Sequence, residues 1–452
     1  MEHPLPIDEK RTLLRDLLQP TVIVGALGYF VDIYDLTLFM AIREQSLRDL
    51  GLEDLIRNGE WYHDLMSWQM VGMIIGGIVF GVFGDKMGRL ATLFGSILIY
   101  SIANVANSFV DTFWPYAIWR LIAGFGLSGE LGGCISLVAE TLSKERRGFG
   151  TTLVAAVGVF GAVVGALLAE VVTWRTNLRI GGGLGFILLI MRISVSESGM
   201  FHRAKDTTDN HNQEGEHVTR GNFFALFTDK ERFIRYMYCL MIGLPTWLGI
   251  GIIASRGSSH FAPDFGIQGP VFSNRIIAVF YAGVTTGDIA SGLCSQLIKS
   301  RKRTVFIFLS CCLVVQFVYL FLLKGVSNVT FYIVLHFSGF FYGYWGLFVT
   351  ISAEQFGTNL RATVATTIPN FARGSLVPLA YFFTEMTTHH IMGPVPAASI
   401  LTVLCFGLAF FALYHMDETY GKDLDYLEIQ MTSPRKAQQV VAVSERTENL
   451  IQ

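Results

Sequence analysis

Almost the whole chain alternates between long apolar runs and short polar segments. A helix needs roughly 20 apolar residues to cross the hydrocarbon core of a bilayer. Runs of this kind recur twelve times along the sequence, and only one long hydrophilic stretch interrupts their spacing. The pattern predicts an all-α membrane protein whose twelve spans lie at residues 20–41, 65–83, 90–109, 113–138, 151–173, 179–195, 234–254, 272–297, 304–323, 329–353, 364–386 and 397–415.

The hydrophilic stretch at residues 198–232 divides these spans into two sets of six. A repeat supports the division, because acid–base pairs with the same spacing end spans four and ten, at Glu140/Arg147 and Glu354/Arg361. The pairs are offset by 214 residues (354 − 140 and 361 − 147). Two related six-helix bundles with a substrate site between them are a known architecture. We expect an N-terminal bundle, a linker, a C-terminal bundle and a tail at residues 1–197, 198–232, 233–415 and 416–452.

Lysine and arginine gather in the connections that follow the even-numbered spans. Because positive residues favour the cytoplasmic side of a membrane, both termini are predicted to be cytoplasmic. The first 19 residues mix acids and bases without an apolar core, so they do not resemble a cleaved signal. We therefore expect a multi-pass protein of the cell inner membrane.

The composition agrees with a membrane protein and argues against several other functional classes. Charged residues make up 15% of the chain, whereas a soluble protein contains about a quarter. A net charge of −2 provides no positive field for nucleic acid. The six cysteines lie in apolar stretches, and the chain has no nucleophile motif, phosphate loop or closed zinc set. We expect neither an enzyme nor a cofactor or bound metal, and we expect a monomer in the lipid bilayer.

The loop after span two reads Gly-Val-Phe-Gly-Asp-Lys-Met-Gly-Arg from Gly81 to Arg89. Gly81 would allow two helices to approach closely, and Gly88 would allow a tight turn. Asp85 would meet the N-terminus of a neighbouring helix or an arginine, as a latch that breaks when the protein changes state. Together with the repeated acid–base pairs, this predicts an inner gate formed by Gly81, Asp85, Gly88, Arg89, Glu140, Arg147, Glu354 and Arg361.

This loop closely resembles the signature loop of the major facilitator superfamily, G-x-x-x-D-[RK]-x-G-R. The resemblance implies the twelve-helix fold of that superfamily and transport by alternating access. In the second half the counterpart begins at Gly292 but has Gln296 where the acid is expected, so we expect that latch to be built differently.

Two further stretches resemble the metabolite:H⁺ symporter branch, with related features in phosphate and sugar symporters. Span one carries an acidic D-x-Y-D segment from Asp32 to Asp35. Span four carries a run similar to R-x3-G-x-G-x-G-G-E-x-G-G that starts at Arg120 and includes Glu130, with Ser128 in place of one glycine. The resemblance implies that Asp35 pairs with Arg120.

Ionisable side chains in the membrane cost at least about 2.5–3.5 kcal/mol each, so each one needs a reason. Asp32 and Asp35 are three residues apart and share a helix face, where two carboxylates resist ionising together. We expect them to couple transport to protons, together with Arg120 and Glu130. The alternatives are a permanent ion pair between spans one and four and, for Glu130, a structural acceptor between close-packed helices.

Arg373 lies near the middle of span eleven, as Arg120 lies within span four. A guanidinium is a planar fork that suits a carboxylate or a phosphate. The alternative is a salt bridge with Asp288 or Glu385. Aromatic residues near helix-breaking glycine or proline would wall a cavity, which gives a predicted substrate site of Arg373, Asn370, Trp247, Tyr342 and Trp345.

The favoured function is proton-coupled symport of a small organic anion or zwitterion, a carboxylate-bearing metabolite. Three alternatives remain open at this stage: a metal or siderophore transporter, a sugar:H⁺ symporter, and a receptor that keeps the transporter fold.

Overall fold

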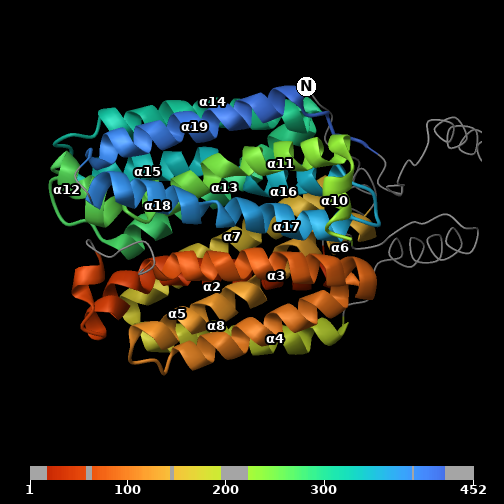
Figure 1. Cartoon of the computed structure of the whole chain (residues 1–452), viewed down its shortest axis with the longest axis horizontal. Coiled ribbons are helices and arrows are strands. Elements are labelled where there is room, and N and C mark those ends of the chain that lie inside the picture. The colour runs from red at the N-terminus through yellow and green to blue at the C-terminus, as the bar shows by residue number, and fades with distance from the viewer. Residues whose placement is uncertain (1–17, 57–63, 143–146, 195–221, 389–390, 423–452) are drawn as a thin grey trace, which may run out of the picture.

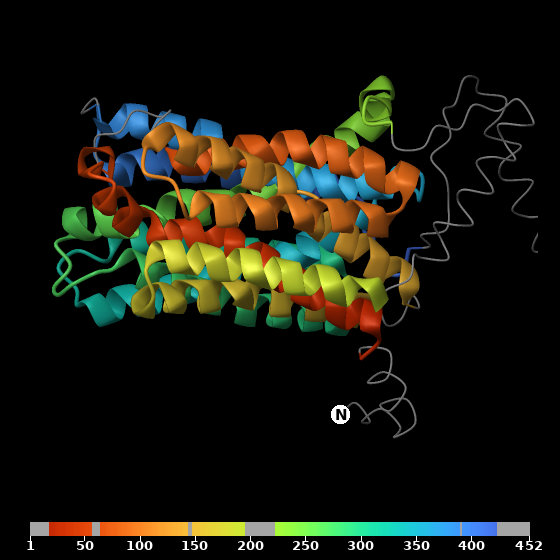
Figure 2. The same ribbon diagram turned by 90° about the horizontal axis from the view of Figure 1, so that it is seen from below.

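The computed structural model describes residues 18–56, 64–142, 147–194, 222–388 and 391–422. Within these residues the helices run side by side along the longest axis of the molecule (Figure 1). The view turned by 90° shows the same parallel arrangement (Figure 2). Helices suit a bilayer, since each backbone polar group must be satisfied within its own segment, and helices that all cross the same layer lie side by side.

The first half contains seven α-helices and two short 3₁₀ turns among the described residues. The helices are α2 (Pro20–Asp49), α3 (Leu65–Met87), α4 (Arg89–Asn107), α5 (Phe113–Leu127), α6 (Glu130–Thr141), α7 (Arg147–Val171) and α8 (Trp174–Met191). The 3₁₀ turns are η1 (Glu53–Ile56) and η3 (Arg192–Ser194).

The second half begins with α10 (Ala225–Thr228), which falls within the predicted linker. Helix α11 (Lys230–Leu248) then continues as the π-helix η4 (Gly249–Ala254). A second π-helical segment and eight further α-helices follow: η5 (Gly257–Phe261), α12 (Ala262–Phe265), α13 (Ser273–Ile298), α14 (Arg301–Phe321), α15 (Asn328–Tyr342), α16 (Trp345–Glu354), α17 (Arg361–Gly374), α18 (Leu376–Thr388) and α19 (Pro394–His415).

The predicted spans are confirmed, and each one coincides with one helix or with two consecutive helices. In the described part of the chain, nine helices are long and apolar enough to cross a membrane. The other three crossings are α8 and the interrupted pairs α5–α6 and α17–α18. In α5–α6 and α17–α18 neither piece alone covers the hydrocarbon core, whereas the pair α15–α16 (Asn328–Glu354) is counted as one of the nine.

Two helix breaks lie at equivalent positions of the internal repeat. Span four is interrupted at Ser128–Gly129 and span ten at Gly343–Tyr344. The offset between the glycines is 214 residues (343 − 129), the same as for the acid–base pairs. Interrupted helices in transporters present unpaired backbone groups near the middle of the membrane. The hydropathy pattern predicts continuous spans here, and the structure shows that both are broken.

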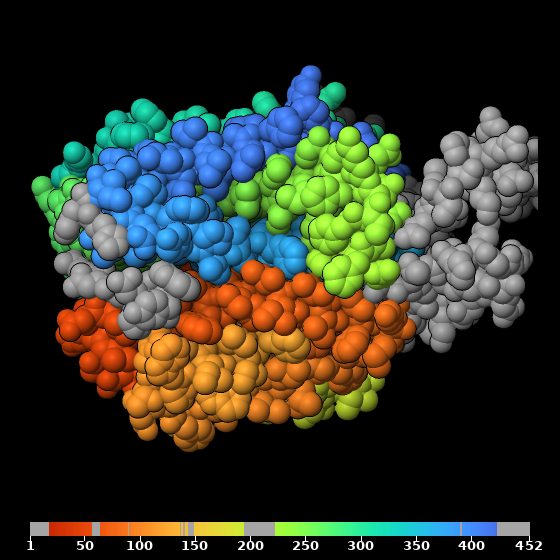
Figure 3. All heavy atoms as spheres, in the orientation of Figure 1, coloured from red at the N-terminus to blue at the C-terminus, as the bar shows by residue number. Residues whose placement is uncertain are grey.

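The two halves pack directly against each other along the whole length of the molecule (Figure 3). Helix α3 meets α17 through small residues: a Cβ atom added at Gly81 would lie 3.0 Å from the Cα of Thr363. One added at Gly84 would lie 3.2 Å from the Cβ of Ala362. These glycines bring α3 and α17 into close contact at the end of the bundle where Asp85 lies. This end is here called the Asp85 end. The opposite end is called the Glu44 end.

We predict that Gly81→Val destabilises the protein by about 1–3 kcal/mol, because the added atoms force α3 away from α17. Thermal unfolding of purified protein in detergent measures this. Gly183→Val is the matched control, since a Cβ at Gly183 meets nothing within 4 Å. Equal effects of the two substitutions would contradict the prediction.

Candidate functional site

The site is organised around an arginine and an aspartate that face each other across the two halves. Arg373, on α17, and Asp32, on α2, are both fully buried. The Arg373 Nη2 lies 3.6 Å from the Asp32 Oδ2, which is an ion-pair distance but too long for a hydrogen bond. Among the described residues, Nε and Nη2 of Arg373 and both oxygens of Asp32 lack hydrogen-bond partners. The predicted alternatives for Arg373, Asp288 and Glu385, are not its partners.

Asn370 lies one turn before Arg373 and connects it to the break in span four. Its Oδ1 accepts a hydrogen bond from the Arg373 Nη1 at 3.3 Å. Its Nδ2 donates to the backbone oxygen of Ser128 at 2.7 Å. Asn370 is one of the predicted substrate-site residues, and the structure brings it to the interface between the halves.

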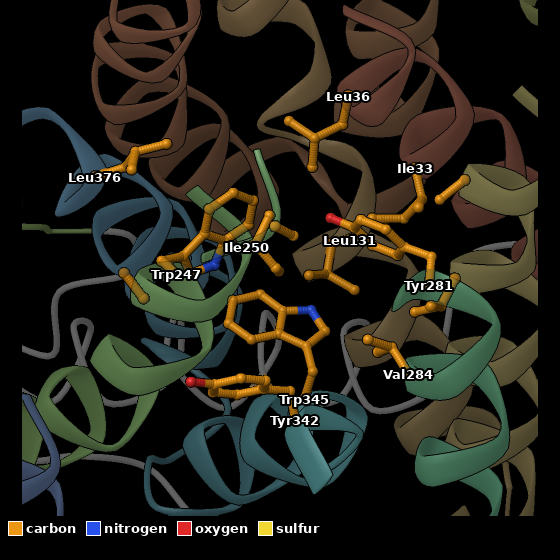
Figure 4. Close-up of a cluster of buried hydrophobic side chains, with 14 of the residues drawn as sticks. Ile33, Leu36, Leu131, Trp247, Ile250, Tyr281, Val284, Tyr342, Trp345 and Leu376 are labelled. Carbon is orange, nitrogen blue, oxygen red and sulfur yellow. The ribbon is translucent and has the colours of Figure 1, made fainter. Parts of the chain in front are cut away.

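A group of buried aromatic rings forms the neighbouring wall (Figure 4). The Trp345 Nε1 donates to the Tyr29 hydroxyl at 3.0 Å, and the Arg373 guanidinium lies 5.8 Å from the Trp345 ring centroid. Trp247 stands nearly perpendicular to Trp345, with centroids 6.0 Å apart. Tyr342 lies beneath Trp345 in Figure 4, and its hydroxyl donates to Gln316 at 3.4 Å within the second half. A cation beside flat apolar rings suits a planar anion.

Asp35 and Arg120 are both buried, but the described structure contains no ion pair between them. Arg120 instead donates to the Asn104 Oδ1 at 2.7 Å, and the side-chain amide of Asn107 faces its Nε. Both oxygens of Asp35 lack hydrogen-bond partners. The pairing implied by the family resemblance is therefore not formed in this state, although Arg120 remains within electrostatic range of Asp35.

Glu130 opens α6 and is paired with Arg192, a residue that sequence reasoning missed. Both side chains are buried, and the Arg192 Nη2 donates to the Glu130 Oε1. A Cβ at Gly28 of α2 would collide with both partners, so the pair is enclosed by close packing. Arg192 lies at the end of span six, where an arginine is expected to reach the membrane surface. The usable signal was its position inside the predicted apolar run.

The Asp85 carboxylate holds the first turn of α17 across the interface. It accepts hydrogen bonds from the backbone N–H groups of Ala362 and Thr363 at 3.1 and 2.8 Å, and from the Thr363 hydroxyl at 2.6 Å. These donors have no partner within their own helix, and the helix dipole favours a negative charge there. Gly88 makes the following turn with a φ of 106°, which favours glycine.

The remaining predicted gate residues fall into two groups. Glu354 is buried and accepts two hydrogen bonds from Arg301, at 2.7 and 2.8 Å. Arg361 is buried at the start of α17. The side chains of the other three, Arg89, Glu140 and Arg147, lie outside the part of the structure that is described.

The second-half counterpart of the signature loop is built differently, as its sequence predicts. Gln296 accepts a hydrogen bond from the Tyr420 hydroxyl at 3.3 Å. Glu418 caps the start of α14 by accepting from the Ser300 hydroxyl and from the backbone N–H of Arg301. Burial alone would raise the pKa of Glu418, but these and neighbouring hydrogen bonds outweigh it and lower that pKa below its usual value.

At the Glu44 end the halves are also connected by polar contacts. The Ser258 hydroxyl donates to Glu44 at 2.9 Å. The Arg275 Nε forms an ion pair with Glu170 at 3.0 Å, and Asn274 donates to the same oxygen at 3.1 Å. The structure is therefore bridged at both ends, with the Asp32–Arg373 pair between them. Within the described residues, no three histidine, cysteine, aspartate or glutamate side chains converge as a metal site.

The sequence model of the Major Facilitator Superfamily matches residues 25–380. The chain belongs to this superfamily. It is accordingly a multi-pass membrane transporter and not an enzyme, and the predicted family and twelve-helix fold are confirmed.

Related proteins in this superfamily carry names of small-molecule transporters. The niacin transporter NiaP of Acinetobacter baylyi is 23% identical, over 89% of this chain and 94% of the relative. The gentisate transporter of Corynebacterium glutamicum is 24% identical, over 60% of this chain and 63% of the relative. A putative metabolite transport protein of Haemophilus influenzae is 31% identical, but the alignment spans only 44% of its length and 40% of this chain.

The fold is similar to that of a solved sugar transporter. The proton:xylose symporter XylE, bound to 6-bromo-6-deoxy-D-glucose, superimposes with a TM-score of 0.72 over 90% of this chain and 97% of its own. The sequences are 15% identical, so this likeness concerns the fold alone.

We predict that Arg192→Met destabilises the protein by about 3–5 kcal/mol, because Glu130 is left buried without its partner. Thermal unfolding measures the loss. The double variant Glu130→Gln/Arg192→Met removes the unpaired acid and should recover part of that stability. A double variant no more stable than Arg192→Met would show that the ion pair is not the cause.

Proposed function

We propose that the chain is a secondary active transporter that carries a small organic anion together with protons, by alternating access. The observation that supports this most strongly is Arg373. A guanidinium keeps its charge at physiological pH, and burying donors without partners is costly. Arg373 nevertheless lies fully buried with Nε and Nη2 free of hydrogen bonds. A carboxylate on the substrate would satisfy both groups.

The surrounding rings favour an anion with a flat apolar body. Trp345 lies beside the Arg373 guanidinium, and Trp247 stands against Trp345. Two relatives bear the names of niacin and gentisate transporters, and both compounds are small carboxylic acids with an aromatic ring. We therefore place aromatic carboxylates first among the candidate substrates.

Charge balance supplies a reason for proton coupling. When an anion binds Arg373, it takes the place of Asp32 as the counter-ion. Asp32 would then be an unpaired buried carboxylate, which is costly unless it takes up a proton. Anion and proton would thus enter together, leaving the site neutral. Asp35, one turn further along α2 and without hydrogen-bond partners, is placed to exchange this proton and to pair with Arg120 in another state of the cycle.

We also propose that the Asp85 end faces the cytoplasm of a cell whose inner membrane contains the protein. Basic residues at this end support this orientation, such as Lys299 just before α14 and Lys302 and Arg303 in its first turn. Both halves of the site come from one chain, so a monomer would suffice for transport. The predicted division at residues 198–232 fits this scheme, with one bundle on either side.

Removing the guanidinium tests the proposed substrate class. Arg373→Ala should weaken binding of benzoate or nicotinate roughly 10–100-fold, the range expected from losing charged hydrogen bonds. Ligand-dependent thermal stabilisation of purified protein measures the affinity. Arg373→Ala/Asp32→Asn guards against misfolding, because it leaves no unpaired acid.

Arg175→Ala is the control, since Arg175 pairs with the exposed Asp111 far from the site. Undiminished stabilisation by these anions in Arg373→Ala would refute the role of Arg373.

Proton coupling is tested separately by Asp35→Asn. We expect exchange of labelled substrate across proteoliposomes to continue, while accumulation driven by a pH gradient is lost. Asp49→Asn is the matched control at the far end of the same helix, where Asp49 accepts from the Trp174 indole at 2.8 Å. Gradient-driven accumulation at the native level in Asp35→Asn would exclude this carboxylate as the proton carrier.

A further inference from the structure

The break in span ten is held by two polar side chains of α13. The Ser291 hydroxyl donates to the backbone oxygen of Gly343 at 2.6 Å, at the end of α15. The Asp288 Oδ1 accepts from the backbone N–H of Gly346 at 2.9 Å, in the first turn of α16. A break leaves such carbonyl and N–H groups without helical partners. Helix α13 therefore supplies a partner on each side of the interruption.

Close packing fixes the same point from both halves of the molecule. A Cβ at Gly343 would collide with the backbone of Gly287, so α13 lies directly against the break. A Cβ at Gly346 would collide with the Ala155 side chain, on α7 of the first half. The start of α16 is thus confined between α13 and α7. Neither neighbour leaves room for this turn to move toward it.

Trp345 lies within this confined turn, immediately before the residue that Asp288 holds. Its indole reaches the Tyr29 hydroxyl at 3.0 Å and stands 5.8 Å from the Arg373 guanidinium. The Trp345 ring is attached to the backbone of this turn through a single methylene group. A small movement of the turn therefore moves the ring as well. The hydrogen bond to Asp288 thus holds the turn that carries the Trp345 ring.

Asp288 itself has no other described role. It is 2% exposed, its Oδ2 has no hydrogen-bond partner, and its predicted pairing with Arg373 is not formed. A buried acid is costly, and packing alone would be served by an apolar residue. An acceptor at the first turn of α16 gains from the helix dipole and from a free N–H group.

We propose that Asp288 is a positioning residue that sets the Trp345 ring beside Arg373 and so makes the site prefer aromatic over aliphatic carboxylates. Ser291 assists by holding the other side of the break. This proposal rests on the proposed function, because it concerns how the anion site selects its ligand.

The first experiment needs no ligand. Hydrogen–deuterium exchange of the backbone across residues 343–350 is compared in native protein, Asp288→Ala and Asp288→Asn. We expect faster exchange in Asp288→Ala and near-native exchange in Asp288→Asn, because an amide oxygen can accept the same N–H. Ser291→Ala should also exchange faster. Ser295→Ala is its control, since Ser295 bonds the Gly292 oxygen within α13.

The second experiment compares benzoate with cyclohexanecarboxylate, which has the same charge and a similar size but no aromatic ring. In Asp288→Ala the preference for benzoate should fall about 3- to 10-fold, the range expected for losing one aromatic contact. Asp288→Asn should keep the native preference. Trp345→Leu should lose the preference as Asp288→Ala does, because both act through the same ring.

The possible outcomes separate the two proposals. Equal weakening of both anions in Asp288→Ala, or equal loss of preference in Asp288→Asn, would overturn the positioning role. If the native protein binds neither anion, the proposed function fails. Unchanged exchange in Asp288→Ala would then also refute the role of Asp288 in holding the break in span ten. Should Asp288→Ala fail to fold, Ser291→Ala against Ser295→Ala decides the matter by the same two measurements.

Discussion

The rest of the site depends on one constraint: a permanently charged guanidinium lies in the membrane core and needs an anion beside it. In this structure the anion is Asp32, which belongs to the other half and stands 3.6 Å from Arg373. The distance is short enough to neutralise the charge but too long to use its hydrogen bonds. Electrostatics therefore holds the halves together at this point while leaving donors for another ligand.

Much of the fold could be predicted from the sequence because membrane solvation acts on each helix separately. Hydropathy located all the spans, and the loop around Asp85 indicated the superfamily before any contact was known. Arg373 could be singled out because an arginine within an apolar run is costly wherever it points. These inferences need only local sequence, and the structure and the comparisons confirm the fold and the family.

Partners could not be predicted, because they depend on contacts between distant helices. Nothing near Arg373 in the sequence indicates that α2 supplies its counter-ion, or that Arg192 is enclosed beside Glu130. The helix breaks were missed for a related reason. Gly129 and Gly343 lie in apolar runs long enough to be continuous, and the interruption requires neighbours such as Ser291 to satisfy the freed backbone. Only tertiary packing determines these features.

The break in span four differs from that in span ten in the origin of its partner. Its free carbonyl, at Ser128, receives a hydrogen bond from Asn370 of the opposite half. Since the acceptor is main chain, this contact does not use the Ser128 side chain, although Ser128 is fully buried beside Gly76 and only a small residue fits there. When the halves part, water can replace the amide at little net cost. The molecule thus contains a contact between its halves in which a side chain of one half recognises the backbone of the other.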